Sequence, residues 1–308
     1  MVAHTVGRDR LSQRLAWEDL DQGFLGQLIA RARDEDLAGA GLRRRPAASG
    51  DPSARSLAGP EEGAAHVVAR EDLVVCGLPL LPLVLSVYGN DAKATPLADD
   101  GERVGAGTVL AQLRGARATL LTAERVLLNF LQHLSGIATH TAAYANALAD
   151  SPTRLLDTRK TTPGFRVLEK YAVARGGGWN HRIGLFDRVM IKDNHLAAGG
   201  TAKGDRLARY VTQTARDNPG LPIEVEVDSL DQIPPVLQAK PDVILLDNFS
   251  LEELRQAVTL IGDTCATEAS GGVTLESLPG LGRLGLTFVS CGALTHQSRW
   301  KDIALDWG

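Results

Sequence analysis

The sequence predicts an α/β protein in which a mixed N-terminal domain precedes an α/β barrel, and three observations lead to this prediction. A helical stretch and several short strand-like stretches fill the first 120 residues. From about residue 153, strand-like segments alternate with helical ones. Four of these strand-like segments in succession end in a charged residue. Alternating strands and helices are typical of a parallel sheet, and six or more such units indicate a barrel.

The first domain is predicted to contain a helix, a loop and a small sheet. Residues 11–38 carry apolar residues at roughly helical spacing, which indicates a helix. Residues 39–62 are rich in Gly, Pro, Ser and Ala without periodicity, which is typical of a loop. The run of three arginines inside it is interpreted as solvated. Four short segments between residues 64 and 114 predict the strands of a small sheet: AAHVVAR, LVVCG, LVLSVYG and TVLAQLRG.

A long helical segment follows this sheet. Leucines at helical spacing give residues 117–149 an apolar face, so we expect one long helix or two helices broken near Gly136. Arg125 and Asn129 lie four residues apart in this segment, and they therefore share one face of the helix.

The second domain is predicted to be built from strand–helix units. The candidate strands are RLLDTRK, RVMIKD, PIEVEVD, DVILLDN, CATEAS and LTFVSCG, and helices are expected at residues 164–174, 204–217, 229–238 and 250–260. We place the N-terminal domain at residues 1–120 and the barrel at residues 121–296. Residues 297–308 contain the alternating segment DIALDW, which we expect to return as a strand to the first domain.

The charged strand ends predict a site at one mouth of the barrel. Lys160, Lys192, Glu226 and Asp247 follow four successive strands, and in a parallel barrel such ends meet at the same mouth. Glu224 has the same parity as Glu226 and is an alternative to it. Two cations and two carboxylates suit an ionic ligand that binds with a metal ion. The competing interpretation is a set of salt bridges between barrel strands, which four charged ends in succession disfavour.

Two glycine turns predict phosphate binding. The last two candidate strands run into turns with backbone N–H groups at the positions where barrels bind phosphate. The residues concerned are Ser270, Gly271 and Gly272 in the first turn and Cys291, Gly292 and Ala293 in the second. The thiol of Cys291 is most simply a small apolar filler.

Residues 157–195 form a basic stretch with eight Lys or Arg side chains against four Asp or Glu side chains. Cations beside strand ends and glycine loops usually bind phosphate or carboxylate. His181 and Arg182 follow three glycines, and we expect both to contact a ligand. His195 either orients Lys192 or makes local hydrogen bonds in its loop.

Composition excludes several classes of partner. A formal net charge of −4 argues against nucleic acid as the main partner. Three cysteines without a CxxC pair favour a reducing, cytoplasmic location. The N-terminus has no apolar signal region, and the most apolar run, residues 78–85, is too short to cross a membrane. No zinc-site spacing, HExxH or GxSxG motif is present.

The ordered motifs of the chain resemble the quinolinate phosphoribosyltransferase family. The motifs are TAERVLLNFLQHLSGIAT, DTRKTTPG, EKYAV, GGGxNHR, IKDNH, EVEVDSL, LLDNF, EASGG and GALTH, and they cover most of residues 100–308. The resemblance implies a mixed α/β, sandwich-like N-terminal domain and an incomplete, open α/β barrel. It also implies a homodimer, or a hexamer built as a trimer of dimers, in which active sites are shared across the interface.

The resemblance implies a reaction between quinolinate and phosphoribosyl pyrophosphate in NAD biosynthesis. With Mg²⁺ as cofactor, this reaction yields nicotinate mononucleotide, pyrophosphate and CO₂. Two alternatives stay open. One is a divergent paralogue that uses another ring acid, as in the molybdenum-associated relatives of the family. The other is a non-catalytic protein that binds a phosphate-bearing ligand.

Site residues carried over by the resemblance fall into three groups. Quinolinate would contact Thr158, Arg159, His181, Arg182 and His195, together with Arg125 of a partner subunit. Catalysis would rest on Lys160, Lys192, Glu226 and Asp247, and the two carboxylates would hold Mg²⁺ and ribose hydroxyls, directly or through water. The two glycine turns would hold phosphate.

Overall fold

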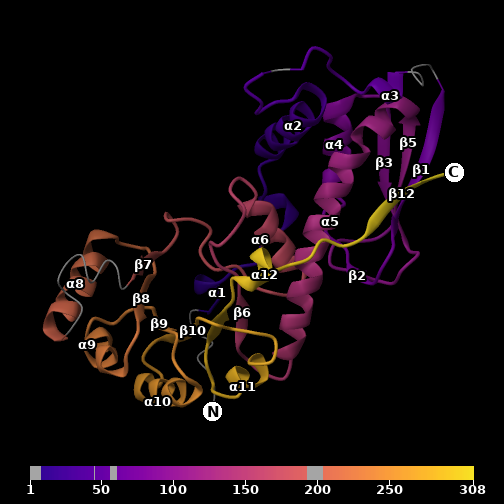
Figure 1. Ribbon diagram of the computed structural model, residues 1–308. Coiled ribbons are helices and arrows are strands. Elements are labelled where there is room, and N and C mark those ends of the chain that lie inside the picture. The colour runs from indigo at the N-terminus through magenta and orange to yellow at the C-terminus, as the bar shows by residue number, and fades with distance from the viewer. Residues whose placement is uncertain (1–7, 45, 56–60, 193–203) are drawn as a thin grey trace. The chain divides into compact units, whose positions relative to one another are not determined.

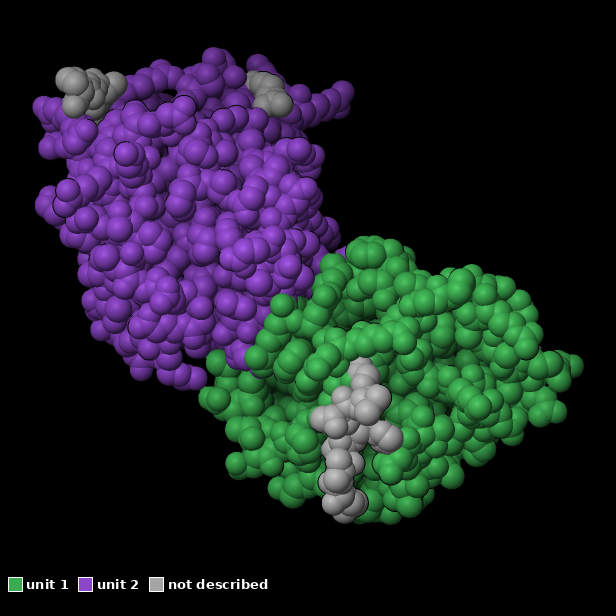
Figure 2. All heavy atoms as spheres, turned by 180° about the vertical axis from the view of Figure 1, so that it is seen from behind, with its two compact units in different colours: residues 1–14, 141–162, 178–297 green, residues 15–140, 163–177, 298–308 purple. Residues whose placement is uncertain are grey.

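The computed structural model describes residues 8–44, 46–55, 61–192 and 204–308, and the chain divides into two compact units (Figure 2). Unit 1 comprises residues 1–14, 141–162 and 178–297, and unit 2 comprises residues 15–140, 163–177 and 298–308. The border expected at residue 120 falls inside one continuous helix, α5 (Arg117–Ala147).

Unit 2 contains a four-stranded antiparallel sheet in the order β12-β1-β5-β3. Its strands are β1 (Glu62–Ala69), β3 (Ala92–Pro96), β5 (Val109–Ala116) and β12 (Ile303–Trp307). A second small sheet pairs β2 (Leu73–Val74) with β4 (Arg103–Val104). The helices are η1 (Trp17–Asp19), α2 (Gln22–Ala38), α3 (Pro52–Arg55), α4 (Leu80–Tyr88), most of α5, and α6 (Arg166–Arg175). The strand β12 is the returning segment DIALDW, and it pairs with β1 (Figure 1).

One expected strand of unit 2 is wrong. The segment LVLSVYG lies in helix α4, not in the sheet. Its buried residues are Leu80, Leu81, Val84 and Leu85, so the apolar residues recur at helical spacing on one face. Pro79 precedes the first turn and Gly89 follows the last, where these residues are favourable at helix ends. A short, uniformly apolar run does not distinguish the two elements by its pattern.

The two long helices of unit 2 also refine the expected ranges. Helix α2 begins only at Gln22, because the Asp21 side chain accepts hydrogen bonds from the backbone of Gly23 and Phe24 and so caps the helix there. Helix α5 is continuous through Gly136. A Cβ atom at this position would lie 2.3 Å from the carbonyl oxygen of Arg299, so Gly136 permits a close approach of the chain that leads to β12.

Unit 1 contains a six-stranded parallel sheet in the order β6-β11-β10-β9-β8-β7. All six strands expected for the barrel are confirmed: β6 (Arg154–Leu156), β7 (Val189–Ile191), β8 (Ile223–Val227), β9 (Val243–Asp247), β10 (Ala266–Ser270) and β11 (Phe288–Ser290). The helices are α1 (Arg8–Leu11), α8 (Gly204–Asp217), η2 (Leu230–Gln232), α9 (Ile233–Gln238), α10 (Leu251–Ile261), α11 (Leu278–Gly282) and α12 (Ala293–His296). In Figure 1, α8, α9, α10 and α11 lie along the outer side of the sheet.

The parallel sheet is an open barrel, because its edge strands β6 and β7 do not pair with each other. Beyond β6, Trp179 bridges Leu156, and Asn180 forms an antiparallel bridge with Gln13. Arg14 and Arg154 each place a guanidinium over the Trp179 ring, at 4.3 and 3.8 Å from its centroid. The N-terminal segment, residues 8–14, therefore extends the edge of the barrel.

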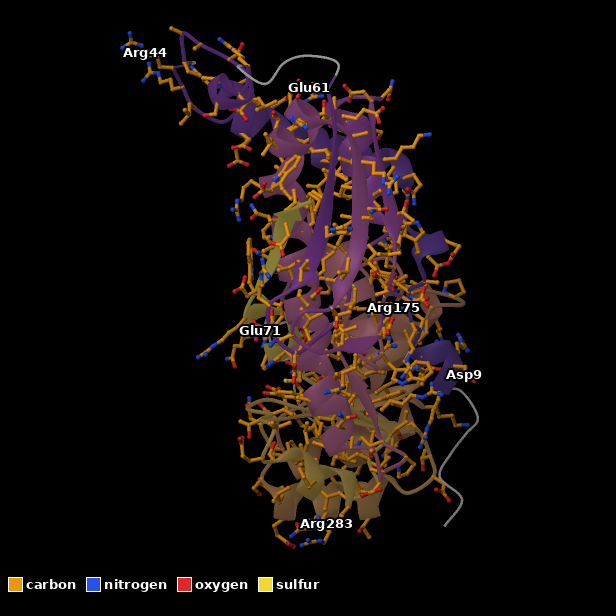
Figure 3. All side chains as sticks on the ribbon, turned by 90° about the vertical axis from the view of Figure 1, so that its right-hand side faces the viewer. Asp9, Arg44, Glu61, Glu71, Arg175 and Arg283 are labelled. Atoms are coloured by element: carbon orange, nitrogen blue, oxygen red, sulfur yellow. The ribbon has the colours of Figure 1, made fainter. Side chains whose placement is uncertain are left out.

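Asp9 fixes the start of this segment. Its carboxylate accepts a hydrogen bond from Arg154 Nη2 at 2.8 Å, and Figure 3 labels it beside the ribbon of α1. Among the residues described, no helix combines the length and apolar character needed to cross a bilayer.

Candidate active site

The carboxyl ends of the barrel strands in unit 1 surround a cavity of about 370 Å³. Every one of the six strands, or the segment directly after it, contributes to its wall. The lining residues are Thr158, Arg159, Lys160, His181, Arg182, Met190, Lys192, Glu226, Leu245, Asp247, Glu268, Ser270 and Ser290. Positively and negatively charged side chains thus meet at the mouth of a parallel barrel, where this fold binds its ligands.

Most of the residues predicted from the sequence lie in this one cavity. All four charged strand-end residues line it, as do Thr158, Arg159, His181, Arg182 and Ser270. The other turn residues, Gly271, Gly272, Cys291, Gly292 and Ala293, lie next in the chain to lining residues without lining the cavity themselves. Arg125 is exposed on the part of α5 that belongs to unit 2. His195 lies outside the described residues.

Lys160 follows β6 by four residues and is held by its own backbone. Its N–H donates to Thr158 Oγ1 at 3.0 Å, and its carbonyl oxygen accepts from Thr295 Oγ1 at 2.8 Å. The aliphatic part of Lys160 passes Gly292, where a Cβ atom would lie 2.9 Å from Lys160 Cδ. Gly292 therefore leaves room for the lysine side chain, a role that does not require a phosphate ligand.

Arg159 and Arg182 form the cationic side of the cavity. Arg159 Nε is buried and has no hydrogen-bond partner among the described residues. Arg182 is 8% exposed, and its Nη1 donates to the carbonyl oxygen of Arg188 at 3.2 Å. Burial and the nearby Arg159 lower the pKa of Arg182. Concentrated, desolvated positive charge of this kind favours binding of an anion.

Glu226 and Asp247 form the acidic side. Lys192 Nζ lies 3.3 Å from Glu226 Oε2, and Asp247 Oδ2 accepts from Asn248 Nδ2 at 2.8 Å. Both carboxylates also line a small adjoining cavity of about 30 Å³. Two carboxylates facing one small space supply hard oxygen donors, which Mg²⁺ prefers in combination with water and phosphate oxygens.

The turn after β10 packs tightly against the end of β9. The backbone N–H of Asn248 donates to the Ser270 carbonyl oxygen at 2.9 Å. Gly271 has φ +93°, and a Cβ atom there would lie 2.1 Å from Asn248 Oδ1. The first glycine of the turn is therefore required by packing as well as by its backbone conformation.

Cys291 behaves as a buried neutral thiol. Its side chain is 3% exposed, and its Sγ lies 3.5 Å from the carbonyl oxygen of Val273. Burial raises the pKa of the thiol. These observations agree with its interpretation as a small apolar filler.

A layer of buried charge lies one pleat step below the cavity mouth, and the sequence interpretation missed most of it. Glu224 and Glu268 are both fully buried, and Arg188 is 4% exposed. Strand parity with Glu226 had already made Glu224 a candidate. The same signal could have found Glu268, because it precedes Ser270 by two residues and thus faces the same interior. Arg188 carries the same signal, since it begins the expected strand RVMIKD and has the parity of Met190 and Lys192, which line the cavity.

Comparison with known proteins places both halves of the chain in one family. The family model described as Quinolinate phosphoribosyl transferase, C-terminal domain, matches residues 137–306, and the corresponding N-terminal domain model matches residues 52–135. A probable nicotinate-nucleotide pyrophosphorylase (carboxylating) of Bacillus subtilis is 40% identical over 260 residues, which are 84% of this chain and 88% of that protein. The nicotinate-nucleotide pyrophosphorylase (carboxylating) of Mycobacterium leprae is 44% identical over 245 residues, 78% of this chain and 84% of that one.

Solved structures agree with this result. The nicotinate-nucleotide pyrophosphorylase from Francisella tularensis superposes with a TM-score of 0.85 at 34% identity, covering 96% of this chain and 100% of its own. NadC from Streptococcus pyogenes also gives a TM-score of 0.85, at 36% identity and with coverage of 94% and 99%. With both domain models matched in order and relatives aligned over most of their length, the chain belongs to the quinolinate phosphoribosyltransferase family.

Proposed function

We propose that the protein transfers the phosphoribosyl group of phosphoribosyl pyrophosphate to quinolinate, with loss of CO₂, and so forms nicotinate mononucleotide for NAD biosynthesis. One observation carries this proposal. The cavity of unit 1 is lined by Arg159 and Arg182, which are close enough to interact, and by Glu226 and Asp247, which together also line a small adjoining cavity. The two proposed substrates suit these residues. Quinolinate is a dianion, which suits the arginines, and the ribose of phosphoribosyl pyrophosphate offers hydroxyl groups, which suit the carboxylates.

The cationic side would bind the two carboxylates of quinolinate. The buried Nε of Arg159 has no hydrogen-bond acceptor among the described residues, and a carboxylate oxygen of quinolinate would supply one. Lys160 and Lys192 reach the same cavity with single ammonium groups. We assign these two to the reacting centre and the pyrophosphate, where charge changes most. Contacts of Thr158 and His195 with quinolinate stay predictions.

The acidic side would hold Mg²⁺ and the ribose. The donor set fits, because Mg²⁺ is commonly held by one or two carboxylates and completed by water and substrate phosphates. When bound, the ion would neutralise charge on the departing pyrophosphate. Glu226 and Asp247 would also accept hydrogen bonds from ribose hydroxyls. The turns after β10 and β11 would offer backbone N–H groups to phosphate.

The chemistry needs positioning more than a side-chain base. The ring nitrogen of quinolinate forms the new bond to C1′ of the ribose while the bond from C1′ to the pyrophosphate oxygen breaks. Fixed cations around this step stabilise the departing charge without reorganising. The quaternised ring nitrogen then stabilises the electron pair left at C2 when CO₂ departs, and a proton takes its place.

We also propose that the active form is a two-fold dimer, alone or within a hexamer, in which Arg125 serves the cavity of the partner subunit. Arg125 is exposed on the part of α5 that belongs to unit 2, and it shares the family motif TAERVLLN. An isologous interface would let each subunit give and receive this arginine. Three free cysteines, Cys76, Cys265 and Cys291, support a reducing, cytoplasmic location.

A direct assay tests the function. Quinolinate labelled in its C2 carboxyl group is incubated with phosphoribosyl pyrophosphate and Mg²⁺, and labelled CO₂ and nicotinate mononucleotide are measured. We expect both products in equal amounts, and neither with a chelator present. Nicotinate, which lacks the C2 carboxylate, should be a poor substrate. Binding of both ligands without CO₂ release would favour a binding protein, and turnover of a different ring acid would favour a divergent paralogue.

A further inference from the structure

Beneath the cavity, three buried side chains converge on the Nε2 atom of His181. Glu224 Oε2 lies 3.2 Å from this nitrogen, Glu268 Oε1 lies 3.4 Å from it, and Arg188 Nη1 lies 3.4 Å from it. Arg188 Nη1 also donates to Glu224 Oε2 at 2.9 Å. The glutamates come from β8 and β10, whereas His181 and Arg188 come from the connection between β6 and β7.

This cluster could be taken for a metal site, since one ligand atom each from His181, Glu224 and Glu268 lie within 4.8 Å of one another. The position of Arg188 argues against that interpretation. Its guanidinium already supplies a positive charge in contact with Glu224 and close to His181, so a metal ion would meet like charge at short range. The cluster is better described as an internal set of ion pairs.

Charge balance within the cluster depends on His181. Two carboxylates face a single arginine, so a charged imidazole would make the buried set neutral. Burial lowers the pKa of His181, but the carboxylates of Glu224 and Glu268 raise it by more, to about 9. The backbone N–H of Arg182 acts in the opposite sense, because it lies 2.7 Å from His181 Nδ1 and can donate only to an unprotonated nitrogen. Two full charges outweigh one amide dipole in a buried site.

Glu268 is the member of the cluster whose burial is least compensated by hydrogen bonds. It lines the cavity and is fully buried, yet neither of its carboxylate oxygens has a hydrogen-bond donor within the described chain. Its ion pair with His181 is the contact that offsets its burial. A buried carboxylate with so little compensation is costly for stability, so its presence points to a role in the site.

We propose that Glu268 is a positioning residue, which keeps His181 cationic and thereby holds the His181–Arg182 pair as the anion-binding wall of the cavity. This inference rests on the proposed function. His181 adjoins Arg182 in the chain, and Arg182 is tied to the same cluster through the carbonyl oxygen of Arg188. Other charged groups around His181 are Glu224, Arg188 and Asp157, whose Oδ1 accepts the His181 backbone N–H at 2.8 Å.

The test replaces Glu268 by Gln, which keeps the size of the side chain and removes its charge. Histidines are labelled with ¹⁵N in the ring, and the seven resonance sets are assigned by a His181→Gln variant. Ring nitrogen shifts report directly whether both nitrogens carry a proton. In the wild-type protein we expect His181 to stay doubly protonated through neutral pH. In E268Q the midpoint should fall by about one pH unit or more.

The kinetic readout separates positioning from a general structural effect. At pH 9, where a fall of one unit takes His181 from half charged to about one-tenth charged, the KM for quinolinate should rise about fivefold in E268Q, while the KM for phosphoribosyl pyrophosphate stays within about twofold. At pH 6 the quinolinate KM of variant and wild type should converge, because His181 is charged in both. Glu268→Asp, which keeps the charge, should restore most of the wild-type behaviour. Glu252→Gln, the same exchange at an exposed position on α10, is the matched control.

Several outcomes would overturn the inference. A neutral His181 at pH 7.5 in the wild-type protein would overturn it. This measurement needs no variant, so it decides the question even if E268Q fails to fold. An unchanged His181 titration or quinolinate KM in folded E268Q would also overturn it. Failure of the proposed function would show differently, as a wild-type protein that releases no CO₂ from quinolinate while the His181 titration remains measurable.

Discussion

Lys160 and Lys192 reach the cavity by different routes. Lys160 sits beyond the end of β6 on a backbone held by Thr158 and Thr295, whereas Lys192 follows β7 directly and pairs with Glu226. For single residues, the sequence predicted the site correctly where a charged residue ends a strand-like segment, as Lys192 does. It did not reveal the partners of Arg188, which lie on β8 and in the N-terminal segment. Such partners are far away in the chain, so no local pattern announces them.

Replacement of either lysine by Ala should lower kcat by about 10²–10³-fold, since each removes a fixed charge from the reaction centre. Thermal unfolding should change little, because neither ammonium group is buried in the core. Steady-state kinetics and calorimetry measure the two effects. Lys93→Ala, on an exposed position of β3, is the control and should keep full activity. Near wild-type turnover in both cavity variants would refute the assignment of these lysines to the reacting centre.

The buried charge cluster predicts how stability depends on pH. Burial raises the pKa of Glu224, but His181 and Arg188 lower it by more, from 4.5 to about 2. Its contribution is therefore complete above pH 4.5 and disappears as the pH falls toward 2. His181 is shifted upward, from 6.5 to about 9, so its contribution is complete below pH 6.5 and is lost as the pH rises through 9.

We therefore expect the free energy of unfolding to fall between pH 6.5 and 9 by on the order of 3 kcal/mol through His181. Urea unfolding at a series of pH values measures this slope. His181→Gln should flatten it, whereas His66→Gln on β1 should leave it intact. A wild-type protein whose stability is constant over this range would contradict a charged His181.

At the scale of elements, the barrel strands were predictable and the small N-terminal elements were less so. Strands such as β7 and β9 are apolar runs that end in charge, β8 alternates Val or Ile with Glu, and helices α8 and α10 have clear apolar faces. Helix α4 was missed because its run is uniformly apolar, so helix and strand patterns coincide over residues 80–88. Only packing against α2 and β3 decides between them.

The turn after β10 connects two elements of the site. Gly271→Ala should weaken binding of phosphoribosyl pyrophosphate by about tenfold or more, because the new Cβ would displace Asn248, which holds Asp247. Gly272→Ala is a stringent control. It also has a positive φ, +59°, but its Cβ would meet nothing within 4 Å. Calorimetric titration of both variants gives the comparison, and equal losses would show that backbone conformation alone is responsible.

At the scale of the whole molecule, the sequence correctly indicated a sheet-containing first part and a barrel. The two units are not divided at a single border, because each is built from three separate segments of the chain. Residues 8–14 belong with the barrel, because Gln13 bridges Asn180 and the Leu11 carbonyl oxygen accepts from Arg188. Residues 163–177 belong with the N-terminal sheet, where Tyr171 donates to Asp100 at 2.8 Å. These are tertiary contacts between distant segments, which periodicity cannot reveal.

Mixing two inactive variants tests the proposed shared site. Arg125→Ala and Lys192→Ala chains, each inactive alone, should regain activity on subunit exchange, because a mixed dimer has one doubly altered site and one intact site. With random assortment, at most about a quarter of all sites would be intact under closed two-fold geometry. Mass spectrometry of tagged chains verifies the exchange. If mixed dimers form but are no more active than either parent variant, Arg125 acts in the active site of its own subunit or has no role in the reaction.

The pairing of β1 with β12 has a consequence for synthesis on the ribosome. Arg70, just after β1, forms an ion pair with Asp306, which lies 236 positions later. The sheet of unit 2 therefore cannot be completed until the entire barrel sequence has been translated. During that interval β1 presents an open edge of backbone N–H and C=O groups, to which a strand from another nascent chain could add. Slow translation or crowded polysomes would prolong this exposure, and chaperones that cover strand edges would be most useful then.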